Sequence, residues 1–184
     1  MPRRTDTRDR MLRTAADLFR NQGYHATGLN QVLAEGGAPK GSLYFHFPGG
    51  KEQLAVEAVA LAGENLRVAL QAVLESDPDP VAALDQALEL LGANLERTDY
   101  RGGCPIATVA LDAAAESEPI RAACDAAYSS WQRLIAAHVG DDGTAMVVLA
   151  AIEGALLLAR TRRDLTPLTD VRNHLGALLG RTPR

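Results

Sequence analysis

Apolar residues recur at intervals of three and four along most of the chain, which is the spacing of one face of an α-helix. Residues 5–22, for example, carry Leu12, Ala15, Ala16 and Phe19 on one side. Long runs of alternating β-branched residues are missing, so the pattern predicts an all-α protein. Nine predicted helices are separated by breaks at residues 23, 35–39, 48–50, 76–80, 101–105, 119, 140–143 and 160–167.

The first three predicted helices form a small unit of their own. Gly23 suits a left-handed C-cap of the first helix, and Thr27 suits the N-cap of a short second helix. The third helix is predicted over residues 40–47, with Pro39 at its first position. Two short helices joined by a glycine-bearing turn predict a helix-turn-helix. We therefore expect a DNA-binding domain over residues 1–50 and a six-helix body over residues 51–184.

The segment 145–159 has almost no polar face and is predicted to be covered on nearly all sides. It is interrupted by Glu153 and too short to span a bilayer. A neighbouring helix with a single apolar stripe follows it, so the two carry more apolar surface than one small body easily covers. A homodimer through the last two helices would bury that surface. The alternative is that residues 145–159 form the central helix of a monomer.

Aromatic residues are scarce, yet Tyr44, Phe45 and Phe47 fall within four positions. Four successive positions cover the whole circumference of a helix, so a core cannot take all three rings. Leu43 and Phe47 lie four apart and can face the other two helices of the head. Tyr44, Phe45 and His46 are then expected to point partly or wholly outward.

The distribution of charge also changes near residue 51, close to the predicted domain boundary. Residues 1–51 hold eight Lys and Arg against four Asp and Glu, whereas residues 52–184 hold eleven against nineteen. A basic head on an acidic body is typical of a nucleic-acid contact confined to one end. Phosphates, bases and sugars of duplex DNA can then be contacted by Thr27, Lys40, Gly41, Ser42, Tyr44, Phe45, His46 and Lys51.

The stretch "AADLFRNQGYHATGLNQVLAEGGAPKGSLYFHFPGGKEQL" resembles the DNA-binding head of the TetR family of transcriptional regulators, over roughly residues 8–60. Two departures are visible. The loop at residues 48–50 is one residue longer than the commonest family form, which affects the alignment of Lys51. Gly28 stands where the family usually has a basic residue, so base readout from that position is not expected.

The stretch "RGGCPIATVALDAAAESEPIR" resembles the body of the LmrA/YxaF-type branch, which includes repressors of drug-efflux genes. The resemblance implies a homodimer that binds a palindromic operator and a body pocket for a small-molecule effector. Polar and aromatic residues of the body suit a hydrophobic or aromatic effector, although ordinary core packing explains each of them singly. The candidates are Asn94, Tyr100, Cys104, Asp112, Tyr128 and Trp131.

Other functions find less support in the sequence. The four histidines are scattered, and no nucleophile motif, phosphate-binding loop or metal-ligand cluster is present, so we expect no catalysis, cofactor or metal. A helical dimer that binds small molecules without recognising DNA is a second alternative. Cys104 and Cys124 are expected to be buried reduced thiols, with a redox-sensing pair as the alternative. No secretory signal precedes the first helix, so a cytoplasmic location without membrane attachment is expected.

Overall fold

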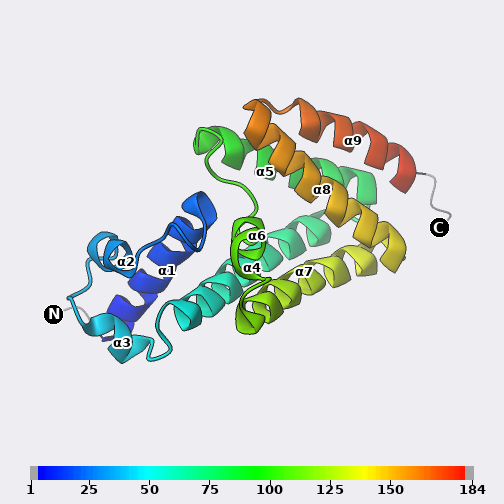
Figure 1. Ribbon diagram of the computed structural model, residues 1–184. Coiled ribbons are helices and arrows are strands. Elements are labelled where there is room, and N and C mark those ends of the chain that lie inside the picture. Colours follow the sequence, from blue (N-terminus) through cyan, green and yellow to red (C-terminus); the bar gives the residue numbers. More distant parts are fainter. Residues whose placement is uncertain (1–3, 181–184) are drawn as a thin grey trace. The chain divides into compact units, whose positions relative to one another are not determined.

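The computed structural model describes residues 4–180, and within that range the chain forms nine α-helices and no strand (Figure 1). The prediction of an all-α protein with a three-helix head and a six-helix body is confirmed. The helices are α1 (Arg4–Gln22), α2 (Leu29–Glu35), α3 (Ser42–His46), α4 (Gly50–Ser76), α5 (Pro80–Arg97), α6 (Ala107–Ala113), α7 (Glu118–Val139), α8 (Asp142–Arg162) and α9 (Thr166–Leu179).

The chain packs as two compact units. The first comprises Met1–Asn65 and Pro105–Ala127, and the second comprises Leu66–Cys104 and Tyr128–Arg184. The head helices therefore share a core with the first part of α4, with α6 and with the first part of α7. The boundary expected at residue 50, between a DNA-binding domain and a body, does not coincide with the limits of these packing units. As a boundary between functions it stays a prediction.

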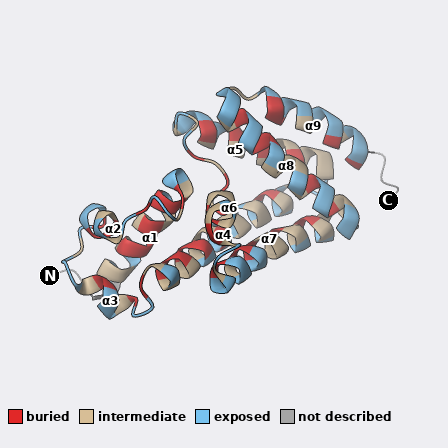
Figure 2. Ribbon diagram, viewed as in Figure 1, coloured by how far each residue is buried: buried red, intermediate tan, exposed pale blue. Residues whose placement is uncertain are grey.

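The core of the first unit follows the predicted spacing. Met11, Ala15 and Phe19 succeed one another at intervals of four on α1 and are buried. Leu43 and Phe47 are 2% and 0% exposed, which confirms that these two residues anchor the third helix. Figure 2 shows the buried side of α1 and the buried positions of the first half of α4.

Gly23 ends α1 as predicted, because it has a φ of 87° and its amide donates to the carbonyl oxygen of Phe19 at 2.9 Å. The predicted N-cap at Thr27 is wrong, since Gly28 occupies the N-cap position of α2. The Thr27 hydroxyl instead donates to the carbonyl oxygen of Gly23 at 2.7 Å. That bond satisfies an acceptor beyond the end of α1 and turns the side chain inward.

Pro39 does not begin the third helix, which starts at Ser42. Gly41 precedes it with a φ of 91°, a left-handed conformation that cannot continue into a helical turn from Pro39 or Lys40. The Ser42 hydroxyl donates to the carbonyl oxygen of Pro39 at 2.7 Å and closes a turn there. The third helix is consequently shorter than residues 40–47.

The sixth and seventh helices also differ from expectation at one end. Helix α6 ends at Ala113, five residues before the predicted stop, and α7 begins at Glu118. Pro119 therefore lies in the first turn of α7, where its missing amide hydrogen breaks no helical bond. The predicted break at residue 119 therefore falls inside α7, and α6 ends before it.

The second unit is built around α5, α8 and α9, which pack on one another. Leu84, Leu88 and Leu95 of α5 follow one another at helical spacing and are buried. Arg172 of α9 donates two hydrogen bonds to the Asp85 carboxylate of α5, at 2.7 and 2.6 Å, which fixes the register of these two helices.

The single chain covers helix α8 on one side only, and the cover of its other side by a second copy stays a prediction. Its inner face buries Ala145, Val148, Ala155, Leu156 and Ala159. Its outer face leaves large apolar side chains about half exposed, namely Met146 (50%), Val147 (52%), Leu157 (59%) and Leu158 (47%).

Candidate nucleic-acid interface

Helix α3 presents the aromatic side chains that the sequence singled out. Tyr44 and Phe45 are 63% and 59% exposed, and His46 is partly exposed. The ring of Phe45 meets the ring of His46 edge to face, with centroids 5.0 Å apart. The expectation that these rings point outward while Leu43 and Phe47 point inward is confirmed.

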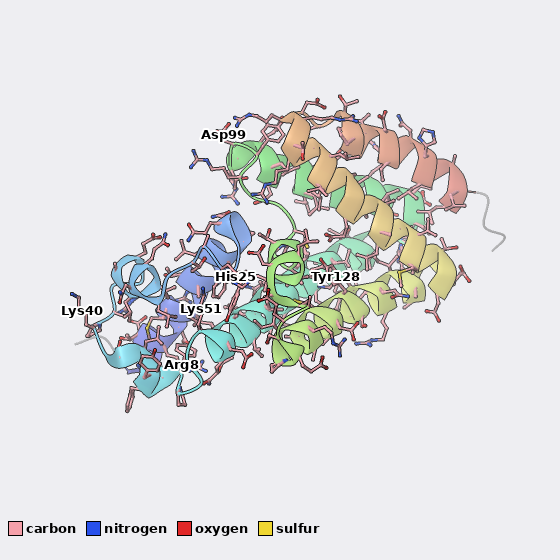
Figure 3. All side chains as sticks on the ribbon, in the orientation of Figure 1. Arg8, His25, Lys40, Lys51, Asp99 and Tyr128 are labelled. Atoms are coloured by element: carbon pink, nitrogen blue, oxygen red, sulfur yellow. The ribbon has the colours of Figure 1, made fainter. Side chains whose placement is uncertain are left out.

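The segment leading into α3 leaves the backbone accessible. Lys40 and Gly41 are exposed, and nothing lies within 4 Å of the position that a Gly41 side chain would occupy. Lys40 projects outward from the turn before α3 (Figure 3). A flexible cation and an unobstructed backbone thus stand beside the exposed rings, an arrangement that suits close approach to a phosphate.

Lys51 lies at the second position of α4 and is held by the turn between α1 and α2. Its Nζ donates to the carbonyl oxygen of His25 at 3.3 Å and lies 4.5 Å from the centre of the Tyr24 ring. Burial lowers the pKa of Lys51 below its usual value. An ammonium group has three donors, so two remain for an anion outside the protein.

The backbone around the start of α4 is also held by contacts within the chain. The Gly49 amide donates to Oε1 of Gln53 at 2.8 Å, so this amide is already used within the chain. Gly50 has a φ of 67° and opens α4 one residue before the predicted start at Lys51. The ring of Tyr44 lies close to it, because a side-chain carbon on Gly50 would be 3.5 Å from Cε1 of Tyr44.

Two other polar residues of the head are used for packing. Thr27, a predicted DNA contact, is 1% exposed, and its backbone amide donates to the carbonyl oxygen of Tyr24 at 3.3 Å. Arg8 of α1 forms an ion pair with Glu57 of α4, and its guanidinium lies 4.9 Å from the centre of the Phe47 ring. Thr27 is thus held inside the head, and the half-buried Arg8 joins α1 to α4.

Three of the six predicted effector residues come together in the second unit. Sγ of Cys104 lies 3.8 Å from the hydroxyl oxygen of Tyr128. The ring of Tyr128 meets the ring of Trp131 edge to face, with centroids 5.3 Å apart, and Trp131 is 2% exposed. A thiol, a phenol and an indole therefore form one continuous cluster on α7 and the loop before α6.

The other three predicted effector residues lie elsewhere. Tyr100 has its ring 6.0 Å from the guanidinium carbon of Arg163, and Oδ1 of Asn94 accepts a hydrogen bond from Arg97 at 2.7 Å. Asp112 belongs to the first unit, where its backbone carbonyl oxygen lies 3.0 Å from Nε2 of His25. Asp112 and the cluster of Cys104 thus belong to different compact units.

Family models match both parts of the chain. Residues 11–58 match the model for bacterial regulatory proteins of the tetR family, and residues 80–174 match the C-terminal domain of LmrA/YxaF-like transcriptional regulators. The chain belongs to the TetR family of transcriptional regulators. It is accordingly a regulator with a DNA-binding fold and not an enzyme, and the resemblance to the LmrA/YxaF branch is confirmed.

Individual relatives of this TetR-family chain match it over nearly its whole length. The HTH-type regulator LmrA of Bacillus subtilis is 39% identical, over 96% of this chain and 98% of LmrA. YxaF of the same organism is 37% identical, over 97% and 98%. The crystal structure of a TetR regulator from Chloroflexus aurantiacus superposes with a TM-score of 0.84 at 29% identity, over 97% of this chain and 96% of that one. CifR, solved with a 26-bp double-strand operator DNA, superposes with a TM-score of 0.79 at 23% identity, over 95% and 96%.

Two groups of polar residues in this TetR-family structure escaped the sequence-based prediction. Glu153 of α8 forms a hydrogen bond with Cys104, and burial raises the pKa of the Glu153 carboxyl. Its position as the one acid within the apolar run 145–159 was the available signal. His25 contacts Asp112 of α6 and Glu116 beyond it, and no motif marks it, because these partners are 87 and 91 positions further along the chain.

The two cysteines are free and buried, as expected. Burial raises the pKa of the Cys124 thiol to about 11, so at neutral pH it carries almost no nucleophilic thiolate. Among the residues that the structure describes, no group of three His, Cys, Asp or Glu side chains is arranged to hold a metal ion.

Proposed function

We propose that this TetR-family regulator is a repressor that binds a palindromic operator as a homodimer and is released by a small hydrophobic or aromatic effector. The observation that carries the proposal is the outward presentation of Tyr44 and Phe45 on a helix anchored by Leu43 and Phe47. Exposing two rings next to each other in water is unfavourable unless a partner covers them.

Duplex DNA is the partner whose chemistry fits that surface. The phenol of Tyr44 and the imidazole of His46 can donate hydrogen bonds to phosphate oxygens, and the Phe45 ring can lie against a thymine methyl group or a sugar. Lys40 can reach a phosphate or a base edge, while Gly41 and Ser42 allow close approach. Lys51 supplies a second phosphate contact. The burial of Thr27 leaves no donor for DNA, so we exclude it from the proposed contacts.

The dimer is supported by the outer face of α8. Nothing lies within 4 Å of the position that a Gly154 side chain would occupy, so the α8 backbone is accessible there. Met146, Val147, Leu157 and Leu158 surround that point with exposed apolar surface, and Leu178 of α9 is 43% exposed. A second copy can bring its own α8 and α9 against this face across a two-fold axis. Two recognition helices related in this way must lie about 34–36 Å apart, or a multiple of that spacing.

Two other partners for α8 are less well supported. By length and composition alone α8 could cross a membrane, with a mean hydropathy of 1.7, but a single such helix is weak evidence. The family to which the chain belongs consists of DNA-binding regulators, which favours a protein partner and a cytoplasmic location. A membrane role would also leave the exposed rings of α3 without a function.

We propose the effector site at the cluster of Cys104, Tyr128 and Trp131. An indole and a phenol packed edge to face are suited to contact an aromatic molecule that enters beside them, and the neighbouring Glu153 can add a polar contact. Ordinary core packing remains the alternative for Trp131, and a ligand titration separates the two. Quenching of the fluorescence of this single tryptophan by a bound aromatic compound would support the effector site.

The decisive experiment selects bound sequences from random duplex DNA with the purified full-length protein. A palindromic consensus with half-sites one helical turn apart, or a multiple, is expected. Recovery of no enriched sequence would leave the rival function, a helical protein that binds small molecules without DNA. A matched variant, Tyr44→Ala with Phe45→Ala, should recover no consensus while keeping the helical content of the wild type.

A further inference from the structure

The turn between α1 and α2 is fastened to the end of α6 within the first compact unit. Nε2 of His25 lies 3.0 Å from the carbonyl oxygen of Asp112 and 3.4 Å from Oε2 of Glu116. Gly23, in the same turn, approaches α6 so closely that a side-chain carbon there would be 2.2 Å from Oδ2 of Asp112. The turn and the helix end therefore fit together without room for a side chain at residue 23.

The partners of the His25 ring indicate which of its two nitrogens carries the hydrogen. Both neighbours of Nε2 are oxygen acceptors, so Nε2 carries the hydrogen and donates it. The carbonyl of Asp112 lies in the last turn of α6, which ends at Ala113, and a carbonyl there has no partner within its own helix. His25 satisfies that acceptor and holds its own ring in one orientation.

The same turn holds Lys51. The carbonyl oxygen of His25 accepts the hydrogen bond from Nζ of Lys51 at 3.3 Å, and the Tyr24 ring lies 4.5 Å from Nζ. The Tyr24 and His25 rings meet edge to face, with centroids 5.3 Å apart. Figure 3 shows His25 and Lys51 next to each other at this point. Each of the two contacts of the ammonium group thus comes from a residue of the turn.

We propose that His25 is a positioning residue for DNA binding, which fastens the turn to Asp112 so that the turn holds the Lys51 ammonium at the start of α4. This proposal rests on the proposed function, in which Lys51 contacts an operator phosphate. A free lysine side chain loses conformational entropy when it docks on a phosphate. The turn already restricts the Lys51 side chain in the free protein, so binding a phosphate costs less conformational entropy.

A double-mutant cycle tests whether His25 acts through Lys51. The probe is the duplex that wild-type protein selects from random DNA, and affinity is measured by fluorescence anisotropy. Lys51→Ala is expected to weaken binding by about 30-fold, the range for loss of a charge-assisted hydrogen bond. His25→Ala should weaken it by about 10-fold, and the double variant should match Lys51→Ala within about twofold, because nothing is left to position.

A conservative variant and a matched control separate positioning from general packing. His25→Gln keeps an amide donor that can reach the Asp112 carbonyl, so it should restore affinity to within about threefold of wild type. Ser117→Ala removes a hydrogen bond from Oγ to Oε1 of Glu52 at 2.7 Å, another contact of the segment after α6 with α4 that does not touch Lys51. It should change affinity by less than about twofold.

The possible outcomes are distinct. Circular dichroism and thermal unfolding check that each variant is folded, and should His25→Ala fail to fold, His25→Phe, which keeps a ring beside Tyr24 but has no donor for Asp112, carries the same cycle with Lys51→Ala. If the losses multiply, so that the double variant binds about 300-fold more weakly than wild type, the positioning role is overturned. Unchanged affinity of His25→Ala also overturns it. If wild-type protein selects no sequence, the proposed function falls, and the role of His25 falls with it.

Discussion

Helices α3 and α8 both expose large apolar side chains, but the residues around those side chains differ. On α3, Tyr44 and Phe45 stand beside Lys40, Gly41 and a partly exposed histidine. A cation, a hydrogen-bond donor and an accessible stretch of backbone thus lie within six residues of the two rings. Such a surface can satisfy a polyanion while covering the rings.

The exposed face of α8 has a different composition. Met146, Val147, Leu157 and Leu158 carry no polar atoms apart from the methionine sulfur, and Gly154 leaves the backbone open between them. An apolar face of this kind is stabilised by another apolar helix face at close distance. Exposure of hydrophobic side chains therefore does not identify a partner by itself, whereas the neighbouring charges and glycines do.

The largest difference between the two surfaces is expected in the salt dependence of binding. In the proposed dimer, Lys40 and Lys51 of the two heads would make four contacts to phosphates, and each contact contributes about −0.9 to the slope of log affinity against log salt. Operator affinity should fall by about 150-fold between 50 and 200 mM salt in an anisotropy titration. Sedimentation should find the dimer unchanged over the same range, and a dimer that dissociates with salt would contradict an apolar α8 interface.

A charge in the centre of the α8 face should disrupt assembly. Leu157→Asp places a carboxylate in each copy at the proposed interface, where it would be desolvated without a partner. We expect the dimer dissociation constant to rise by about 100-fold, measured by analytical ultracentrifugation. The monomer should keep its helical content because Leu157 is 59% exposed. Light scattering of the wild type must give twice the chain mass, since a wild-type monomer at micromolar concentration would remove the basis of the comparison.

Loss of one ring on α3 should affect DNA alone. Tyr44→Ala is expected to weaken operator binding by about 30-fold, equivalent to about 2 kcal/mol at a central contact. Tyr44→Phe should cost only a few-fold if the hydroxyl contributes a single phosphate bond. A gel-shift titration measures both, and equal affinity of Tyr44→Ala and wild type would remove Tyr44 from the interface.

The smallest effect is expected at an exposed apolar residue that lies outside both surfaces. Leu111 of α6 is 79% exposed, and the proposed contacts to DNA and to a second copy do not include it. Leu111→Ala should change DNA affinity and dimerisation by less than about twofold and the free energy of unfolding by less than about 0.5 kcal/mol. A large loss of either activity would show that the partner surfaces extend beyond α3 and α8.

Much of the head was predictable because its signals are local. The spacing of Leu43 and Phe47 settled which side of the third helix is buried, and therefore that Tyr44 and Phe45 are exposed. The roles of Thr27 and Pro39 were not predictable in the same way. Thr27 had two acceptable uses for its hydroxyl, and the acceptor at Gly23 prevailed once the turn had folded.

The body was less predictable because its contacts join distant parts of the chain. Cys104, Tyr128 and Trp131 meet as expected, but Asp112 has its backbone contact with His25 in the other unit. Aromatic content and polarity alone could not predict which of these residues belong to which compact unit. The exposure of one face of α8 agrees with the expectation that the last two helices carry more apolar surface than one body covers. Which residues lie on that face could not be predicted, because a helix that is apolar all round has no polar side to mark its orientation.

The sequence by itself determined the helical elements, the buried and exposed sides of the recognition helix and membership of the TetR family. These depend on residue types at fixed short spacings, which the geometry of a helix converts directly into faces. Only the tertiary structure decided that Lys51 is held by the turn around His25, and that this turn is fastened to Asp112. Such contacts depend on where two segments far apart in the chain meet, and helical periodicity carries no information about that.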